Sequence, residues 1–161
     1  MSGPAIAADP QALSVDPAQQ AILLAELEVL LAAVRDPAAR APFADLAAAV
    51  VDGAVAGGDA LATLERLLEM TLQTGRARRV HGPEAEQSLL RLFYQTPHGA
   101  AARRSTEAVN GALRKLAGQT LEEILFTAQG PGVFKLGLST DRCRLALEVD
   151  RHGVTVESLE V

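Results

Sequence analysis

Residues 142–150 read RCRLALEVD, and this segment decides the fold class. Every second residue in it is apolar: Cys143, Leu145, Leu147 and Val149. A period of two is typical of a β-strand with one buried face and one solvated face, because successive side chains in a strand point to opposite sides. We therefore expect a strand here, with its apolar residues turned toward a core.

The residues on both sides of this segment extend it into a meander. Turn signals rich in glycine and proline separate four apolar segments, which we expect to be strands near residues 124–128, 134–138, 143–149 and 154–161. A helical turn competes with the first strand, because Thr120 and Glu123 have the spacing of a capping box. In the last strand the apolar phase shifts between Val156 and Leu159, which predicts a β-bulge.

Upstream of Gly118 the apolar spacing changes to three and four residues, the period of an amphipathic helix. Capping residues and prolines at first helical positions divide this region into about five helices. We expect these helices to begin near Pro17, Pro42, Asp59, Pro83 and Pro97, with the last one running to Ala117. A short turn is expected to precede Pro42, because proline interrupts a helix interior.

This order predicts an α+β fold, in which about five N-terminal helices precede a C-terminal four-stranded antiparallel meander and cover one face of the sheet. We expect residues 1–15 to be a flexible tail and residues 16–161 to form a single α+β domain. Within it, the helical part covers residues 16–118 and the sheet part covers residues 120–161. A single open sheet also has two edges, and pairing the last strand across a two-fold axis would produce a homodimer.

The composition is that of an ordinary globular domain, with 161 residues, 48% of them hydrophobic and 22% charged. The excess of Arg over Lys, 13 to 2, is typical of a GC-rich bacterial genome. The single Cys143 excludes an intramolecular disulfide, and its place on the dry strand face favours a buried, inert thiol. The first sixteen residues lack a basic segment followed by a long apolar one, so we expect a cytoplasmic protein that does not enter a membrane.

No motif in the sequence predicts catalysis, a cofactor or a metal. HExxH, CxxC, GxSxG and GxGxxG are all absent, and no two of the three histidines have helical ligand spacing. The carboxylates nearest the sheet ends, Glu122, Glu123 and Asp141, are better explained as solvated residues of turns and helix starts than as acid–base catalysts. We therefore expect a protein that is not an enzyme.

Charge is unevenly distributed along the chain, whose net charge is −5. Residues 1–75 carry a net charge of −7, residues 76–115 carry +5, and residues 116–161 carry −3. The central basic segment includes the predicted fifth helix, where Arg103 and Arg114 are eleven residues apart. At 3.6 residues per turn, that spacing brings two side chains to within about 20° of each other on the helix surface.

Arg104 and Lys115 have the same spacing of eleven residues, so the fifth helix should present basic side chains opposite its apolar side. Guanidinium groups suit carboxylates and phosphates, because their planar forks donate two hydrogen bonds at once. The basic connector before the fourth helix would extend this surface if the fold brings it alongside. The predicted partner-binding residues are Arg76, Arg78, Arg79, Arg103, Arg104, Arg114 and Lys115.

Three interpretations of these residues remain open: a solvated face, a surface for an acidic protein or for the chain's own acidic helices, and a nucleic-acid contact. We favour a non-enzymatic adaptor or assembly protein, a homodimer that binds a protein partner through charged helix faces. The alternatives are a nucleic-acid-associated regulator that uses the same basic residues, and a small-ligand-binding domain with its pocket between helices and sheet. Nucleic acid is disfavoured by the acidic net charge and by the absence of aromatic residues among the arginines.

Overall fold

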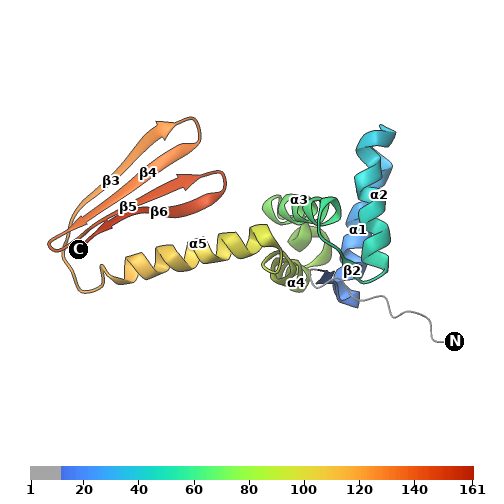
Figure 1. The fold of residues 1–161 in the computed structure, drawn as a ribbon, viewed down its shortest axis with the longest axis horizontal. Helices are drawn as coiled ribbons and strands as arrows, with labels where there is room; N and C mark the ends of the chain where they lie inside the picture. Colours follow the sequence, from blue (N-terminus) through green and yellow to red (C-terminus); the bar gives the residue numbers. More distant parts are fainter. Residues whose placement is uncertain (1–11) are drawn as a thin grey trace. The chain divides into compact units, whose positions relative to one another are not determined.

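The computed structural model describes residues 12–161, which form two compact units. The first, called the helical unit here, extends to Gly99, and the second, the sheet unit, comprises Ala100–Val161. Helix α5, Pro97–Arg114, begins in the helical unit and continues into the sheet unit (Figure 1). The α+β class and the order of helices followed by a four-stranded sheet are confirmed. That both parts form one domain stays a prediction.

The helical unit contains four α-helices and one short π-helix. Their bounds are α1, Pro17–Ala33; α2, Pro37–Val51; α3, Asp59–Gln73; η1, Ala77–His81; and α4, Pro83–Phe93. Helix α1 begins with a capping box, in which Oδ1 of Asp16 accepts the N–H of Gln19 at 2.8 Å and Oε1 of Gln19 accepts the N–H of Asp16 at 3.1 Å. The start predicted at Asp16-Pro17 is therefore confirmed.

The expected break before Pro42 is wrong, because α2 is continuous from Pro37 to Val51 with Pro42 inside it. A proline at this position removes the hydrogen bond to the carbonyl of Ala38, four residues earlier. Ala38 lies in the exposed first turn, where water can take that bond. The helix therefore continues through the proline.

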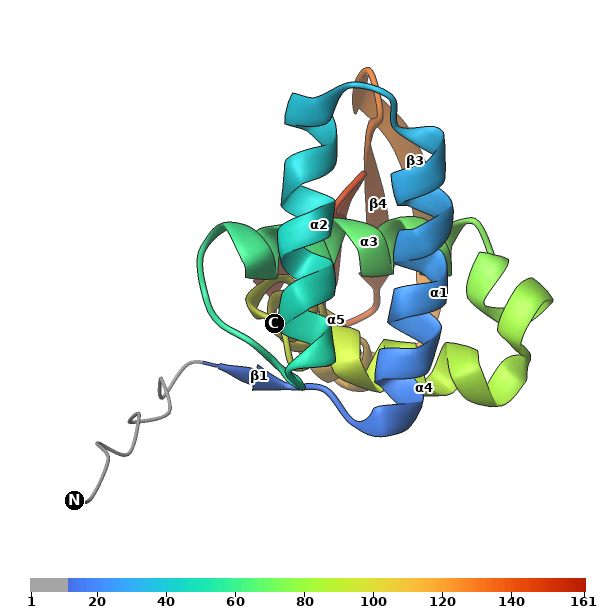
Figure 2. The ribbon, with the colours of Figure 1, turned by 90° about the vertical axis from the view of Figure 1, so that its right-hand side faces the viewer.

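Figure 2 shows α1 and α2 side by side, with α3 crossing them. Their apolar sides form one core, which α4 completes. The fully buried leucines and valines of this core are Leu23, Leu27, Leu46, Val50, Val55, Leu64, Leu67, Leu68, Leu89 and Leu92. The buried side chains of this core are thus mainly aliphatic.

Two short strands, β1 (Leu13–Ser14) and β2 (Ala54–Val55), pair antiparallel beside these helices. Val15, directly after β1, is 4% exposed and packs in the core. Of the predicted flexible tail, residues 1–11 lie outside the described residues, whereas residues 13–15 pair and pack. Neither strand was predicted, because two residues are too few to show a period.

The sheet unit contains the four predicted strands in meander order. Their bounds are β3, Leu121–Gly130; β4, Val133–Thr140; β5, Arg144–Asp150; and β6, Gly153–Glu160. The register between β5 and β6 shifts near Ala146, opposite the predicted bulge. The capping-box spacing of Thr120 and Glu123 does not form a helix, because Leu121–Gly130 pairs along β4 as a strand.

Helix α5 packs on one face of this sheet. Val109 and Ala112 of α5 form one buried cluster with Leu145 and Leu147 of β5, which are 1% and 3% exposed, and Leu116, just beyond the helix, packs against it. Cross-strand pairing places one row of side chains from all four strands on this same face: Phe126, Leu136, Leu147 and Val156. The alternation in residues 142–150 therefore predicted the buried face of the sheet correctly.

Candidate protein-interaction surface

The outward side of α5 carries the basic residues that the sequence singled out. Arg103, Arg104 and Arg114 are exposed, as is Lys115, which follows the last residue of the helix. These four residues are called the basic face. The inward side is held to the sheet both by its apolar residues and by Ser105, whose hydroxyl donates a hydrogen bond to the carbonyl of Val154. The helix is thus fixed in rotation, with its cations turned to solvent.

The cations of the basic face differ in the ion pairs and hydrogen bonds that they form within the sheet unit. Nε of Arg103 lies 3.1 Å from Oε1 of Glu107, an exposed pair at the (i, i+4) spacing. Nε of Arg114 donates to the carbonyl of Asn110 at 3.2 Å. Within the described sheet unit, Arg104 and Lys115 form no ion pair. These two side chains are therefore the most available for an external anion.

The other three predicted binding residues lie in the helical unit and contact that unit's own groups. Arg78 Nη1 lies 3.7 Å from Oε2 of Glu86, and Arg79 Nη2 donates to the carbonyl of Thr74 at 3.3 Å. Arg76 is bound to Glu26 and is half-buried. Arg76 is thus held in the fold by a buried carboxylate, whereas the contacts of Arg78 and Arg79 are exposed, and the alignment of all three with the basic face stays a prediction.

Arg76 belongs to a buried ionic cluster that the sequence analysis did not find. Oε2 of Glu26 accepts a hydrogen bond from Nε of Arg76 at 2.5 Å, and Oε1 lies 2.7 Å from Nε2 of His81. Glu26 is 3% exposed and lies on α1, whereas its two partners flank or end the π-helix η1. The Glu26 cluster, these three residues, therefore fastens η1 to α1.

Burial alone would raise the pKa of Glu26, since it disfavours the charged carboxylate. The hydrogen bonds from Arg76 and His81, together with the charges of both side chains, outweigh that effect and hold the pKa below its usual value. The carboxylate therefore stays ionised, and Arg76 and His81 occupy its two oxygens within the fold. A signal for it exists in the sequence: Glu26 has helical spacing to Leu23 and Leu30, so it falls within the apolar stripe of α1.

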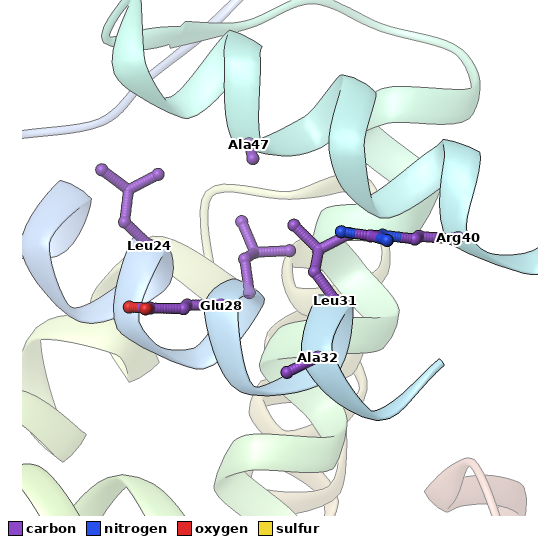
Figure 3. A pocket seen from close by; sticks show the side chains of 7 residues that line it. Leu24, Glu28, Leu31, Ala32, Arg40 and Ala47 are labelled. Atoms are coloured by element: carbon purple, nitrogen blue, oxygen red, sulfur yellow. The ribbon is translucent and has the colours of Figure 1, made fainter. Parts of the chain in front are cut away.

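A shallow hollow of about 340 Å³ lies between α1 and α2 (Figure 3). Aliphatic side chains line most of it, and the charged groups of Glu28 and Arg40 stand at its rim. A second hollow, of about 550 Å³, runs along α5 and is lined by Asn110, Leu113, Arg114 and Ala117. Both are open to solvent.

His98 and His152 form hydrogen bonds and ion pairs with nearby side chains. His98, in the first turn of α5, places Nδ1 2.5 Å from Oε1 of Glu69, and its backbone N–H donates to Oε1 of Glu65 at 2.8 Å. His152 lies in the β5–β6 turn, and its Nε2 accepts a hydrogen bond from Nε of Arg151 at 3.0 Å. Among residues 12–161, no group of three or more metal-ligating side chains is placed to hold a metal ion.

An apolar surface that was not predicted from the sequence extends over β3 and the part of β4 that contains Phe134. The row that α5 covers at β5 continues to Phe126 and Ile124, which are each 59% exposed. Phe134, on the same face of the sheet, is 37% exposed. Exposure rises from β5 toward β3 because α5 packs on the β5–β6 half of the sheet.

None of the helices between residues 12 and 161 combines the length and the hydrophobicity that crossing a membrane requires. No protein-family model, curated protein sequence or solved structure matches this chain.

Proposed function

We propose that this chain is a non-enzymatic protein-interaction protein that docks an acidic partner protein on the basic face of α5. One observation carries the proposal: α5 buries its apolar side in the sheet unit and turns four cations to solvent. Between Ala100 and Lys115, Glu107 is the single carboxylate, and it pairs with Arg103. Arg104 and Lys115 are left to bind carboxylates of a partner.

The chemistry of these side chains supports an acidic protein surface. Arginine forks bind carboxylates through two parallel hydrogen bonds, and α5 spaces its cations at eleven residues, or about 16 Å at 1.5 Å per residue. Arg114 and Lys115 also lie at the C-terminal end of the helix, whose partial negative charge holds cations there in the free protein. Both cations are therefore favourably placed in the free protein.

The same observations favour a protein partner over nucleic acid. No aromatic residue occurs between Ala100 and Lys115, so the basic face lacks the stacking platforms that single-stranded nucleic acid uses. The chain as a whole carries a net charge of −5, which repels a polyanion at long range. A protein with a local acidic patch meets a smaller repulsion.

The proposal is tested with the double variant Arg104→Glu/Lys115→Glu. Immobilised wild-type and variant chains are incubated with nuclease-treated and, in parallel, with untreated lysate of the native cell, and retained proteins are quantified along a salt gradient. We expect a partner that wild type retains at low salt and that the variant loses. It should also elute from wild type as salt rises, because exposed charges are screened within about 10 Å at 0.1 M.

The matched control is Arg142→Glu/Arg151→Glu, which makes the same change in net charge at two exposed turn residues of the sheet unit. This control should retain the partner. Equal retention by wild type and by the Arg104/Lys115 variant would overturn the proposal and leave the basic face as a solvated surface. Binding that disappears on nuclease treatment would instead favour the nucleic-acid alternative.

A further inference from the structure

The two edges of the sheet differ in how they are protected. β3 and β6 are the edge strands, and each presents backbone N–H and C=O groups that no other strand within residues 12–161 takes up. Folded proteins usually blunt such edges with charged residues, prolines or bulges, because an open edge pairs with other strands.

The β6 edge carries such protection. Its second half contains Glu157 and Glu160, and its pairing with β5 shifts in register beside Ala146. The extra residue bends the strand and the carboxylates repel an approaching acidic edge. Pairing of two copies through the last strand, which the sequence suggested, is therefore less favourable than pairing through the first strand of the sheet.

The β3 edge is open over its central part. Residues 124–129 read ILFTAQ, with no charge, no proline and no glycine. Pairing with β4 is regular from Ile124 to Ala128, and the register shifts lie only at the two ends of the strand. Leu125 is 54% exposed, so apolar surface accompanies the free backbone on the sheet face away from α5 as well.

We propose that β3 pairs antiparallel with β3 of a second copy of this chain, about a two-fold axis perpendicular to the sheet, so that two four-stranded sheets become one of eight strands. The proposal goes beyond the docking of an acidic partner and does not depend on it. Arg104 and Lys115 lie on the side of α5 turned away from the sheet, whereas the pairing uses the far edge of the sheet.

Two registers about such an axis keep the exposed apolar side chains of the strand paired with one another. The axis keeps each sheet face on its own side, and strand side chains alternate, so a residue meets a residue of the same parity. When the axis passes beside Leu125 or beside Phe126, both Ile124 and Phe126 lie opposite apolar side chains of the second copy. In the first register Ile124 lies opposite Phe126 of the second copy, and in the second register Phe126 lies opposite its own equivalent. Both registers continue the exposed apolar row into the second copy.

The charges of β3 are complementary to this arrangement. Glu122 and Glu123 lie at one end of the strand, and Thr127 and Gln129 at the other end are uncharged. Antiparallel pairing places Glu123 opposite Thr127 in the first register and opposite Gln129 in the second. No carboxylate then faces another, whereas a parallel arrangement in register would set the acids of the two copies side by side.

The test exploits this pattern with two variants at the same positions. In Thr127→Glu/Gln129→Glu, a carboxylate meets Glu123 of the second copy in either register, twice in each dimer. In Thr127→Lys/Gln129→Lys, an ammonium group meets it instead. Sedimentation equilibrium of the full chain is expected to give a monomer–dimer equilibrium for wild type, a dissociation constant at least roughly tenfold higher for the glutamate variant, and an equal or lower one for the lysine variant.

If the two variants acted on the folding of the monomer instead of on dimerisation, the lysine variant would be the more weakened of the two. Within one chain Thr127 lies opposite Lys135 of β4, so glutamate at 127 favours the monomer fold and lysine disfavours it. Circular dichroism confirms that each variant is folded. As a second readout, amide hydrogen exchange at residues 124–129 should slow as wild-type concentration rises, and it should not slow in the glutamate variant.

Three results would overturn the proposal. The first is a wild-type chain that stays monomeric at all accessible concentrations. The second is a dimer whose dissociation constant neither variant changes, which would place the interface on another surface. The third is equal weakening by both variants, which would contradict the antiparallel opposition of Glu123 to residues 127 and 129. The Arg104→Glu/Lys115→Glu variant should dimerise like wild type, so failure of the docking proposal and failure of this one are distinguishable.

Discussion

Phe126 of β3 and Phe134 of β4 stack on the sheet, with their ring centroids 5.4 Å apart and their planes 13° from parallel. Both rings lie on the sheet face that packs against α5 but outside the cluster that α5 buries, so the stack is open to solvent. In contrast, Leu145 on the same face is 1% exposed beneath the helix. One sheet face therefore contains both a sealed core and an unsealed extension of it.

This difference predicts unequal costs of truncation in the monomer. Phe126→Ala should lower the free energy of unfolding by about 1 kcal/mol, because it removes one aromatic pair that is still largely hydrated. Leu145→Ala should lower it by about 3 kcal/mol, because it leaves a cavity in packed surroundings. Urea denaturation at a concentration that keeps the chain monomeric measures both. Equal losses would mean that β3 is covered in the monomer.

The Glu26 cluster predicts a strong dependence of stability on one carboxylate of α1. Glu26→Ala should lower the free energy of unfolding by about 2 kcal/mol, because it deletes the acceptor of two hydrogen bonds from cationic or imidazole groups. Glu28→Ala, two residues away on the exposed side, should change it by less than about 0.5 kcal/mol. A similar effect of both substitutions in chemical denaturation would contradict the structural role of the cluster.

The lowered pKa of Glu26 also fixes the direction of a pH effect. The unfolded chain binds a proton at this carboxyl at a higher pH than the folded chain does, so acid favours unfolding. The contribution is complete above the unfolded pKa of glutamate, about 4.3, and is lost as pH falls through the lower folded pKa. The difference in stability between wild type and Glu26→Gln should thus shrink as pH falls from 6 to about 3. A difference that grows on acidification would contradict the assigned sign.

Two glycines of α5 predict opposite results for the same substitution. A Cβ on Gly99 would lie 1.9 Å from the carbonyl oxygen of Phe93, a distance that only a backbone shift can relieve. Gly99→Ala should therefore destabilise the chain by about 2 kcal/mol or more. A Cβ on Gly111 meets nothing within 4 Å, so Gly111→Ala should stabilise it by about 0.5–1 kcal/mol through helix propensity. Thermal unfolding of the two variants checks both signs, and two equal shifts would refute the close approach at Gly99.

Much of the fold follows from local patterns that act over a few residues. The alternation in residues 142–150 is strong enough to give the sheet its buried face, and the prolines at 17, 83 and 97 mark helix starts because a first-turn residue needs no N–H donor. At Thr120 to Glu123 two local patterns compete, and the pairing of Leu121–Gly130 with β4 decides for the strand. Local sequence carries no information about that pairing energy.

The rest depends on residues far apart in the chain. Arg76 reads as part of a basic surface from its neighbours, yet it binds Glu26, 50 residues earlier. The apolar pattern of β3 predicts burial, yet Ile124 and Phe126 are exposed because α5 covers the other half of the sheet. In both cases packing between elements sets the environment of the side chain. The periodicity of the local sequence gives no information about that packing. The basic face of α5 was predictable, because helical spacing alone separates it from Val109 and Leu116.

The unequal edges of the sheet have a consequence for stoichiometry. A chain with two open edges can add copies at both ends and grow into a filament, which is the hazard of every exposed β-strand. Here the carboxylates and the register shift of β6 protect one edge of the sheet. Each chain therefore has one open edge, at β3. When two β3 strands meet about a two-fold axis, both open ends are consumed and none remains. Association would then stop at two copies, because the eight-stranded sheet has no open edge left to which a third copy could add.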